Sequence, residues 1–333
     1  MTILERIRQV VEPEFRLYEQ EFERIVRTDN SLLNSVVSHL TSFRGKQLRP
    51  LLTLLCAKLC SSVNDKSITS AVALELIHTA SLIHDDVVDS SDMRRGKESV
   101  NHRWNNKVAV LAGDFLLSRA LNSITGLRNI KVMQAILTMA EQLSLGEMSE
   151  MHYGSSMWIS EEQYIGIVRD KTSSLFSTCA LVGALTAGGS QRQQSALRDF
   201  GEILGICFQL KDDELDYSDS DLIGKPTMSD ISDNKATLPL LIAMQRADKA
   251  DAERIRTLVE EHTDPTTQIV ELPIEAREEI KSFVLRYDGL RYSKQKMEQL
   301  RERAQSSLTT VFRPCPPLQA LQDLLAYSIS RVY

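Results

Sequence analysis

The chain has 333 residues, of which 42% are hydrophobic and 25% are charged. This composition is typical of a globular protein with a substantial core, arranged as one large domain or two ordinary ones. Acidic residues outnumber basic ones by 45 to 39, and no arm rich in Lys and Arg is present, which argues against nucleic acid as a partner. The five cysteines form no C-x-x-C pair, which indicates reduced thiols and a cytoplasmic location.

The first predicted element is an amphipathic helix over residues 3–27, with Ile3, Ile7, Phe15 and Phe22 on one side. Its start carries Glu5 and Arg6 and lacks the apolar segment of a signal peptide. No stretch approaches the ~18 uncharged apolar residues of a membrane span, so we expect no transmembrane segment.

Helical periodicity continues along almost the whole chain, with few Gly and Pro and no alternating β pattern. Residues 41–50 are predicted as a loop that enters a helix with Pro50 near its first turn, and residues 91–107 as a basic polar connection. No linker or repeat divides the chain, so we expect a single all-α domain over residues 1–333. Further helices are predicted at 31–40, 51–62, 68–90, 108–124, 129–153, 160–187, 192–218, 236–247, 275–310 and 317–331.

Three aspartates interrupt the most apolar of these helices. Asp85 and Asp89 are four residues apart and therefore share a helix face, while Asp86 lies about 100° around the helix from Asp85. Neighbouring carboxylates repel one another unless a cation lies between them. Mg²⁺ suits such a site, because it takes one or two protein carboxylates together with water and phosphate oxygens.

The same i, i+1, i+4 spacing recurs at Asp212, Asp213 and Asp216, again within an apolar helical stretch. One acidic cluster alone would most simply be a solvated helix face. Two such clusters in apolar surroundings predict a pair of metal-binding sites that face each other. Several Mg²⁺ ions in turn imply a polyphosphate ligand.

Basic residues accompany both clusters. Arg gives bidentate contacts to phosphate, and Lys gives a point charge. Taken singly, each of these residues could be an ordinary surface charge, and His78, two turns before Asp85, could be a core histidine. Their grouping favours contacts to a ligand, and Gln209 shares the face of the second cluster. The basic residues concerned are Lys46, Arg49, Arg94, Arg95, Lys171, Lys225 and Lys235.

In combination these motifs resemble the trans-isoprenyl diphosphate synthase (polyprenyl synthetase) family, over residues 40–245. The motifs that carry the resemblance occur in order: Gly45-Lys46-x-x-Arg49-Pro50, Leu82-Ile83-His84-Asp85-Asp86-x-x-Asp89, Asp92-Met93-Arg94-Arg95-Gly96, Gly113-Asp114, Lys171-Thr172, Phe208-Gln209-x-x-Asp212-Asp213-x-x-Asp216, Gly224-Lys225 and Lys235-x-Thr237-Leu238-Pro239.

The resemblance implies an all-α isoprenoid-synthase-type bundle around a central cavity, and a homodimer. The implied reaction joins isopentenyl diphosphate to an allylic diphosphate, such as farnesyl or geranyl diphosphate, with two to three Mg²⁺ ions bound to the diphosphate. The implied metal-binding residues are Asp85, Asp89 and Asp212, supported by Asp86, Asp213 and Asp216. Arg94, Lys171 and Lys225 are the implied residues for the allylic diphosphate, and Lys46, Arg49, His78 and Arg95 are those for isopentenyl diphosphate. Lys235 is a further implied substrate-binding residue, assigned to neither substrate.

The implied chemistry fits these residues. Cations stabilise the departing diphosphate, and the side-chain oxygens of Thr172 and Gln209 would steady the allylic cation that remains. A buried helical cavity would exclude water from that cation. The chain departs from the family pattern at four positions. Glu98, Asn234 and Met228 lie in predicted loops, and Glu150 replaces the Gln of a Gly-Glu-x-x-Gln pattern.

The resemblance implies that residues just before the first aspartate motif set product length, by closing or leaving open the cavity below it. Ala80 and Ser81 are small, and Ile77 lies one turn further along the helix, so nothing bulky closes the path on this helix. We therefore expect a product longer than C20, about C30 to C45, of the kind used as quinone side chains. The alternative is that Met139, Leu143 or Met148 on another helix closes the path earlier.

Four other interpretations compete with this one. A terpene cyclase and a head-to-head synthase would each have a different aspartate motif. A short-chain synthase would stop at C15 to C20. A non-catalytic subunit of a heteromeric synthase would usually lack one of the two aspartate motifs, both of which are present here. For a soluble synthase with so apolar a product, we expect transient membrane contact at product release.

Overall fold

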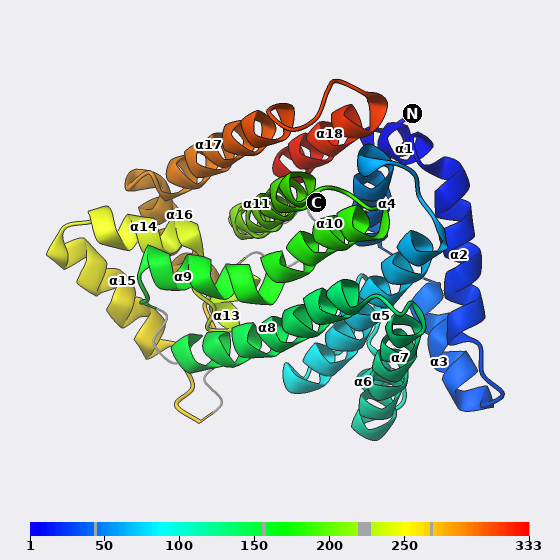
Figure 1. Ribbon diagram of the computed structural model, residues 1–333. Coiled ribbons are helices and arrows are strands. Elements are labelled where there is room, and N and C mark those ends of the chain that lie inside the picture. The colour runs from blue at the N-terminus through cyan, green and yellow to red at the C-terminus, as the bar shows by residue number, and fades with distance from the viewer. Residues whose placement is uncertain (43–44, 155–157, 219–227, 267–268, 333) are drawn as a thin grey trace. The chain divides into compact units, whose positions relative to one another are not determined.

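The protein is described by a computed structural model that covers residues 1–42, 45–154, 158–218, 228–266 and 269–332. Across these ranges the chain is almost entirely α-helical, which confirms the predicted fold class (Figure 1). The helices are α1 (Ile3–Gln9), α2 (Glu12–Val26), α3 (Ser31–Thr41), α4 (Leu48–Cys60), α5 (Asp65–Val88), α6 (Val100–Arg103), α7 (Asn106–Gly126), α8 (Ile130–Gly154), α9 (Glu161–Val168), α10 (Ser174–Thr186), α11 (Gln191–Asp216), α13 (Ser229–Ser232), α14 (Leu238–Arg246), α15 (Lys249–Glu261), α16 (Ile274–Arg286), α17 (Gly289–Thr309) and α18 (Pro316–Ser330).

Three of the predicted helices are interrupted. The helix predicted over residues 3–27 breaks between α1 and α2, where Pro13 occupies the first turn of α2 and has no N–H to continue the helix. The helix predicted over 275–310 breaks at Asp288, which has φ +57°. Between α9 and α10 the chain makes a π-helical turn, η1 (Arg169–Ser173).

Polar side chains set several helix starts. Asn30 and Asn105 accept hydrogen bonds from the exposed backbone N–H groups of α3 and α7, and Asn64 and Ser160 do so for α5 and α9. The predicted polar connection at 91–107 contains an element that alternation did not predict. It is a two-stranded hairpin of β1 (Met93–Arg94) and β2 (Lys97–Glu98), in which Arg94 pairs with Lys97.

By its internal contacts the chain divides into two compact units. Unit 1 comprises residues 1–140, 175–201 and 308–323, and unit 2 comprises residues 141–174, 202–307 and 324–333. In unit 1, α5 packs against α2, α4 and α7, and Figure 1 shows α2 alongside α4 and α5. Gly113 of α7 lets α5 approach, because a Cβ there would lie only 2.2 Å from Nε2 of His84.

Helix α7 is long and apolar enough to cross a membrane, with a mean hydropathy of 1.2. It lies against α5, with the ring of His84 touching Gly113 and bonding to the carbonyl of Val110 at 3.2 Å. A core helix of a globular protein has the same composition, so this helix is weak evidence for a membrane span.

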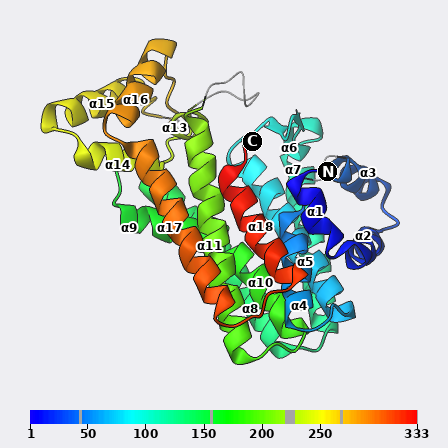
Figure 2. The same cartoon turned by 90° about the horizontal axis from the view of Figure 1, so that it is seen from above.

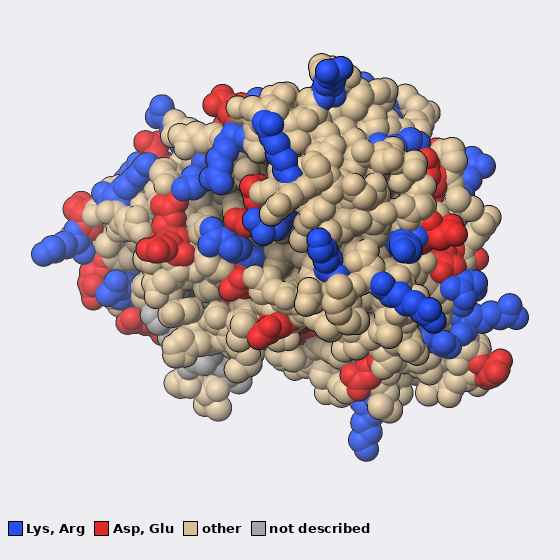
Figure 3. Space-filling model, viewed as in Figure 1, with Lys and Arg blue, Asp and Glu red and all other residues tan. Residues whose placement is uncertain are grey.

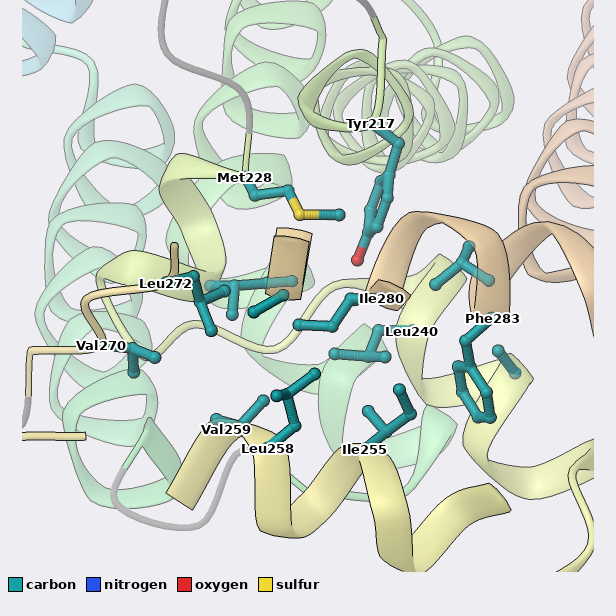
Figure 4. Close-up of a cluster of buried hydrophobic side chains, with 14 residues drawn as sticks. Tyr217, Met228, Leu240, Ile255, Leu258, Val259, Val270, Leu272, Ile280 and Phe283 are labelled. Atoms are coloured by element: carbon teal, nitrogen blue, oxygen red, sulfur yellow. The ribbon is translucent and has the colours of Figure 1, made fainter. Parts of the chain in front are cut away.

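In unit 2, helices α14, α15 and α16 pack together, as two views agree (Figures 1 and 2). Their apolar side chains form a cluster with Tyr217 and Met228 (Figure 4), which includes Leu240, Ile255, Leu258, Ile280 and Phe283. The outer surfaces of these helices carry both charge signs (Figure 3). Arg254 pairs there with Glu279 at 2.9 Å, and Arg286 with Asp251 at 2.9 Å.

Candidate active site

The first acidic cluster lies in unit 1, at the C-terminal end of α5. Asp85 is half-buried, and Asp89 is exposed. The N–H of Asp89 donates to the carbonyl of Asp85 at 2.8 Å, so the two residues stack one turn apart as their spacing predicts. Carboxylates in reach of solvent at a helix end suit a hydrated divalent cation.

Asp86 differs from its two neighbours because it is buried. Its Oδ1 accepts hydrogen bonds from Nε of Arg94, at 2.8 Å, and from Nη2 of the same guanidinium. Burial raises the pKa of Asp86, and the guanidinium of Arg94 acts in the opposite direction. Asp86 therefore fastens the hairpin strand β1 to α5.

The hairpin turn carries Arg95, which has φ +52°, followed by Gly96 with φ +75°. The Arg95 side chain reaches to Gly45, where a Cβ would lie 2.6 Å from the guanidinium carbon. Gly45 is therefore needed for this close approach, which gives a physical reason for glycine in the Gly45-Lys46 motif.

A pocket in unit 1 brings together several of the predicted side chains. Its polar lining includes Glu75, His78, Thr79, Asp86, Arg94 and Arg95. Burial, together with the charges of Arg49, Arg95 and Arg94, holds the pKa of His78 well below its usual range. The pocket thus presents a neutral imidazole beside guanidinium groups, an arrangement that suits a phosphate-bearing ligand.

Among the remaining predicted residues of unit 1, Lys46 precedes α4 and Arg49 lies in it, while Ile77, Ala80 and Ser81 lie in α5. The guanidinium of Arg49 lies 4.6 Å from the ring centre of Phe176, and Lys46 is exposed. Ile77 and Ala80 are buried, so they could limit the length of the product only if the growing chain runs through the interior of unit 1. Ser81 is half-buried, and its hydroxyl donates to the carbonyl of His78 at 2.9 Å.

In unit 2, Lys171 and Thr172 lie in the π-helical turn η1. Such turns occur frequently at functional sites. The backbone of Lys171 passes so close to α8 that a Cβ on Gly146 would lie 2.4 Å from its nitrogen. Gly146 therefore allows the turn to rest on α8.

The ammonium group of Lys171 pairs with two carboxylates of α8. It lies 2.8 Å from Oε2 of Glu147 and also contacts Oε2 of Glu150. Burial disfavours its charged form, but the two carboxylates outweigh burial and raise the pKa of Lys171. Lys171 is therefore a fixed positive charge at a pocket lined by Glu150, Tyr164, Thr172, Gln209, Asp213 and Lys235.

Asp212 and Asp213, in the second acidic cluster, have different environments. Asp212 remains 41% exposed and pairs with Arg331 at 2.7 Å. Asp213 is buried and accepts hydrogen bonds from Tyr164, Gln209 and the backbone N–H of Leu238. Burial raises the pKa of Asp213 to about 7.

Asp216, the third member, is tied to the start of α13. Its Oδ1 accepts from the backbone N–H of Ser229 at 2.9 Å, and its Oδ2 accepts from that of Asp230 at 3.3 Å. Lys235 lines the pocket of unit 2 and pairs with Asp233 at 3.3 Å. Lys225 lies outside the described residues.

Neither acidic cluster forms a closed metal cage by itself. In the described ranges no three His, Cys, Asp or Glu side chains converge as a ready-made metal site.

Comparison with known proteins agrees with the motifs. The family model for polyprenyl synthetase matches residues 30–273. The chain belongs to the polyprenyl synthetase family.

Family membership makes the chain a prenyltransferase that elongates polyprenyl diphosphates. The chain is 32% identical to the octaprenyl diphosphate synthase of Haemophilus influenzae, over 99% of this chain and 98% of that one. It is 32% identical to heptaprenyl diphosphate synthase component 2 of Geobacillus stearothermophilus, over 76% of this chain and 78% of that one. These relatives favour the long-chain interpretation over the short-chain alternative.

The fold comparison gives the same result. The polyprenyl synthase from Caulobacter crescentus, solved in complex with calcium and isoprenyl diphosphate, matches with a TM-score of 0.90. The match has 29% sequence identity and covers 99% of this chain and 98% of the other. The expected isoprenoid-synthase fold is thereby confirmed.

The departures from the family pattern have structural counterparts. Asn234, at a glycine position of the pattern, has φ +57°, a conformation that Asn tolerates better than most residues. Met228, at another glycine position, has φ +59°, and its side chain fills the apolar cluster of Figure 4. Glu150 supplies the second carboxylate on Lys171, where the pattern has a neutral amide.

Residues that escaped the sequence analysis include Glu75 and Thr79 in unit 1, and Glu147, Tyr164, Asp230 and Arg331 in unit 2. Glu147 could have been found from the Gly-Glu-x-x-Gln pattern, which places it one turn from Glu150. Tyr164 and Arg331 carry no local signal, because their partners lie far away in the chain. Asp230 belongs to the second cluster, and burial beside Asp216 and Asp213 raises its pKa well above the usual range.

Proposed function

We propose that the enzyme condenses isopentenyl diphosphate with an allylic diphosphate, head to tail and in the trans configuration, until the product exceeds C20. The observation that carries this proposal is the pocket of unit 1, where His78, Arg94 and Arg95 gather beside the acidic end of α5. A diphosphate fits guanidinium groups, and an acidic helix end fits the metal ion that accompanies a diphosphate.

The cofactor of this proposal is Mg²⁺, two to three ions bound together with the diphosphate. The oxygen donors present fit it, because Asp85, Asp89 and Asp212 all remain in reach of solvent while Asp86 and Asp213 are buried. When bound, the ions would neutralise charge on the departing diphosphate. That the two clusters act on one ligand remains a prediction.

The side chains have separate tasks in this proposal. Lys46, Arg49, His78 and Arg95 hold isopentenyl diphosphate, and Arg94, Lys171, Lys225 and Lys235 hold the allylic diphosphate. The amide oxygen of Gln209 and the hydroxyl of Thr172 face the cation left when the C–O bond breaks. The double bond of isopentenyl diphosphate attacks this cation, and the proton then lost passes to the released diphosphate, so no protein base is required.

Product length would be set along α5. Ala80, Ser81 and Ile77 are small or aliphatic, and we propose that the growing chain runs beside them towards lengths used in quinone side chains. The buried Met139 of α8 belongs to the same unit and is the alternative stop.

We further propose a cytoplasmic homodimer with transient membrane contact at product release. Val110 and Leu111 of α7 and Leu137 of α8 are exposed apolar side chains in unit 1, at 41%, 65% and 46%, and a second copy would cover them. The name of the heptaprenyl relative, a component 2, makes a second polypeptide the competing arrangement. The molar mass of the purified chain in solution distinguishes the two.

Diphosphate release by the purified chain alone tests the proposed reaction. With Mg²⁺, a synthase releases diphosphate only when isopentenyl and allylic diphosphates are both present. A cyclase would release it from the allylic diphosphate alone, and a non-catalytic subunit would release none until its partner is added.

A further inference from the structure

Four side chains that line the pocket of unit 2 form one hydrogen-bonded chain. The hydroxyl of Thr172 donates to Oε1 of Gln209 at 3.1 Å, and Nε2 of Gln209 donates to Oδ1 of Asp213 at 3.1 Å. The hydroxyl of Tyr164 donates to Oδ2 of Asp213 at 2.6 Å. The backbone N–H of Leu238 donates to the same oxygen at 2.9 Å.

The two ends of this chain differ in their exposure. Asp213 and Tyr164 are only 2% and 4% exposed, so their hydrogen bonds have no competition from water. Gln209 and Thr172 are half-buried, and all four side chains line the pocket. Tyr164 and Asp213 are therefore the more rigid end of the chain, and Gln209 and Thr172 are the end more open to a substrate.

The hydrogen bonds fix the direction of the Gln209 amide. Nε2 of Gln209 donates to Oδ1 of Asp213, so the NH₂ group of the amide faces Asp213. The amide oxygen then faces Thr172 and the pocket. That oxygen has two lone pairs, and the hydroxyl of Thr172 uses one of them.

We propose that Tyr164 is a positioning residue for prenyl transfer, which acts through Asp213 to keep the amide oxygen of Gln209 directed at the allylic cation. This inference rests on the proposed function, in which the Gln209 oxygen stabilises that cation. Without the Tyr164 hydroxyl, Asp213 keeps only the Leu238 N–H on Oδ2 and gains freedom to turn. The amide would then lose its fixed direction, which matters more to the transition state than to substrate binding.

The chain offers a matched control in a second tyrosine–carboxylate bond that involves α9. The hydroxyl of Tyr292 donates to the carboxylate of Glu161, at 2.9 and 3.0 Å, in the first turn of α9. This is also a tyrosine–carboxylate bond to α9 within unit 2, but it makes no contact with Gln209. Removing the Tyr292 hydroxyl therefore tests the loss of such a bond without disturbing the amide.

The first experiment compares Tyr164→Phe and Tyr292→Phe by steady-state kinetics, with thermal unfolding to check the fold. We expect Tyr164→Phe to lower kcat by about tenfold while KM for both substrates stays within about twofold. Tyr292→Phe should change neither constant. Equal kcat values for Tyr164→Phe and the wild type, or an equal loss in both variants, would overturn the proposal.

A double-mutant cycle then tests whether Tyr164 acts through Gln209. If it does, Tyr164→Phe has no further effect on kcat once Gln209→Ala is present. Losses that multiply in the double variant would mean that Tyr164 acts by another route and would overturn the proposal.

Asp213→Asn keeps the proposal testable if Tyr164→Phe does not fold. The new amide would use its oxygen for Tyr164 and Leu238 and would present an NH₂ to Gln209, which must then turn its own oxygen away from the pocket. We expect kcat to fall with little change in the Mg²⁺ concentration that gives half-maximal rate; an unchanged kcat would overturn the proposal. If the wild type releases no diphosphate from the two substrates, the proposed function itself fails. This outcome differs from a lowered or an unchanged kcat in the variants, because those are measured against an active wild type.

Discussion

The guanidinium of Arg331, near the C-terminus, lies 2.7 Å from the carboxylate of Asp212 in the second aspartate motif. The same guanidinium donates to the carbonyl of Phe208 at 2.9 Å and stacks on the Phe208 ring, 3.9 Å from its centre. Only 7% of the Arg331 side chain is exposed. The C-terminal segment is thus bound to α11 at the acidic cluster.

We predict that Arg331→Met destabilises the enzyme by about 2 kcal/mol, because the carbonyl of Phe208 and the carboxylate of Asp212 lose their buried charged donor. Urea unfolding measures the change, and limited proteolysis should cut the C-terminal segment sooner. Arg301→Met is the control, since the Arg301–Glu298 pair on α17 is half-exposed and should cost less than about 0.5 kcal/mol. Equal stability of the two variants would contradict the assigned role of Arg331.

The second carboxylate on Lys171 leads to a different prediction. Glu150→Gln restores the amide of the family pattern and removes one negative charge beside the proposed allylic diphosphate site. We expect the KM for farnesyl diphosphate, and the inhibition constant of inorganic pyrophosphate, to fall about fivefold. Glu202→Gln is the control, because Glu202 pairs with Arg169 of the same π-helical turn at 3.1 Å. A rise in both constants would show that Glu150 assists binding.

Ala80→Tyr should shorten the product without abolishing turnover, because the new ring would obstruct the path along α5. Ala80 is buried, so Ser81→Phe, at a half-buried position, is a second test that disturbs packing less. Product chromatography measures the effect. An unchanged product distribution in both folded variants would exclude these positions from the path.

Protonation of His78 should make stability depend on pH. Its pKa is depressed in the folded state, so the unfolded chain takes up a proton near pH 6.5 before the folded enzyme does. The contribution of neutral His78 to the free energy of unfolding is therefore fully present above about pH 6.5. It is lost as the pH falls towards the folded pKa, and the free energy of unfolding drops by no more than about 1.4 kcal/mol per pH unit. His78→Gln should remove this loss.

Urea unfolding between pH 7.5 and 5 compares wild type and His78→Gln. The difference in unfolding free energy should move in favour of the variant as the pH falls. His152→Gln, at an exposed position of α8, is the control. A constant difference across this range would contradict the depressed pKa.

Much of the fold could be predicted from helical periodicity, because apolar side chains recur wherever a helix buries one face. The interruptions could not. The break after α1, the turn at Asp288 and the π-helical turn over Arg169–Ser173 are short local changes of backbone conformation. Hydrophobic periodicity is an average over several helical turns, so it does not detect such short interruptions.

The resemblance separated Asp85, Asp89 and Asp212 from the supporting aspartates, but spacing and composition alone gave no reason for the difference. In the structure Asp85 reaches solvent, and Asp86 is buried against Arg94. Asp212 and Asp213 differ in the same way. Burial depends on which helix packs on which face, and that information lies in distant residues such as Tyr164 and Arg331.

The glycines of the motifs are explained only by the structure. Gly45 admits the Arg95 guanidinium, Gly113 admits the His84 ring, and Gly146 admits the backbone of Lys171. In the sequence Gly45 falls in a predicted loop, while Gly113 and Gly146 fall inside predicted helices, where no local signal calls for glycine. The close approaches that require them involve partners between 25 and 50 residues away along the chain.

Product length tests the central claim most directly. The purified chain is incubated alone with Mg²⁺, farnesyl diphosphate and labelled isopentenyl diphosphate, and the products are separated by chromatography. Trans prenyl elongation by a long-chain synthase predicts labelled products beyond C20, with one diphosphate released for each C5 unit added. No incorporation by the chain alone, or an endpoint at C15 or C20, would contradict it.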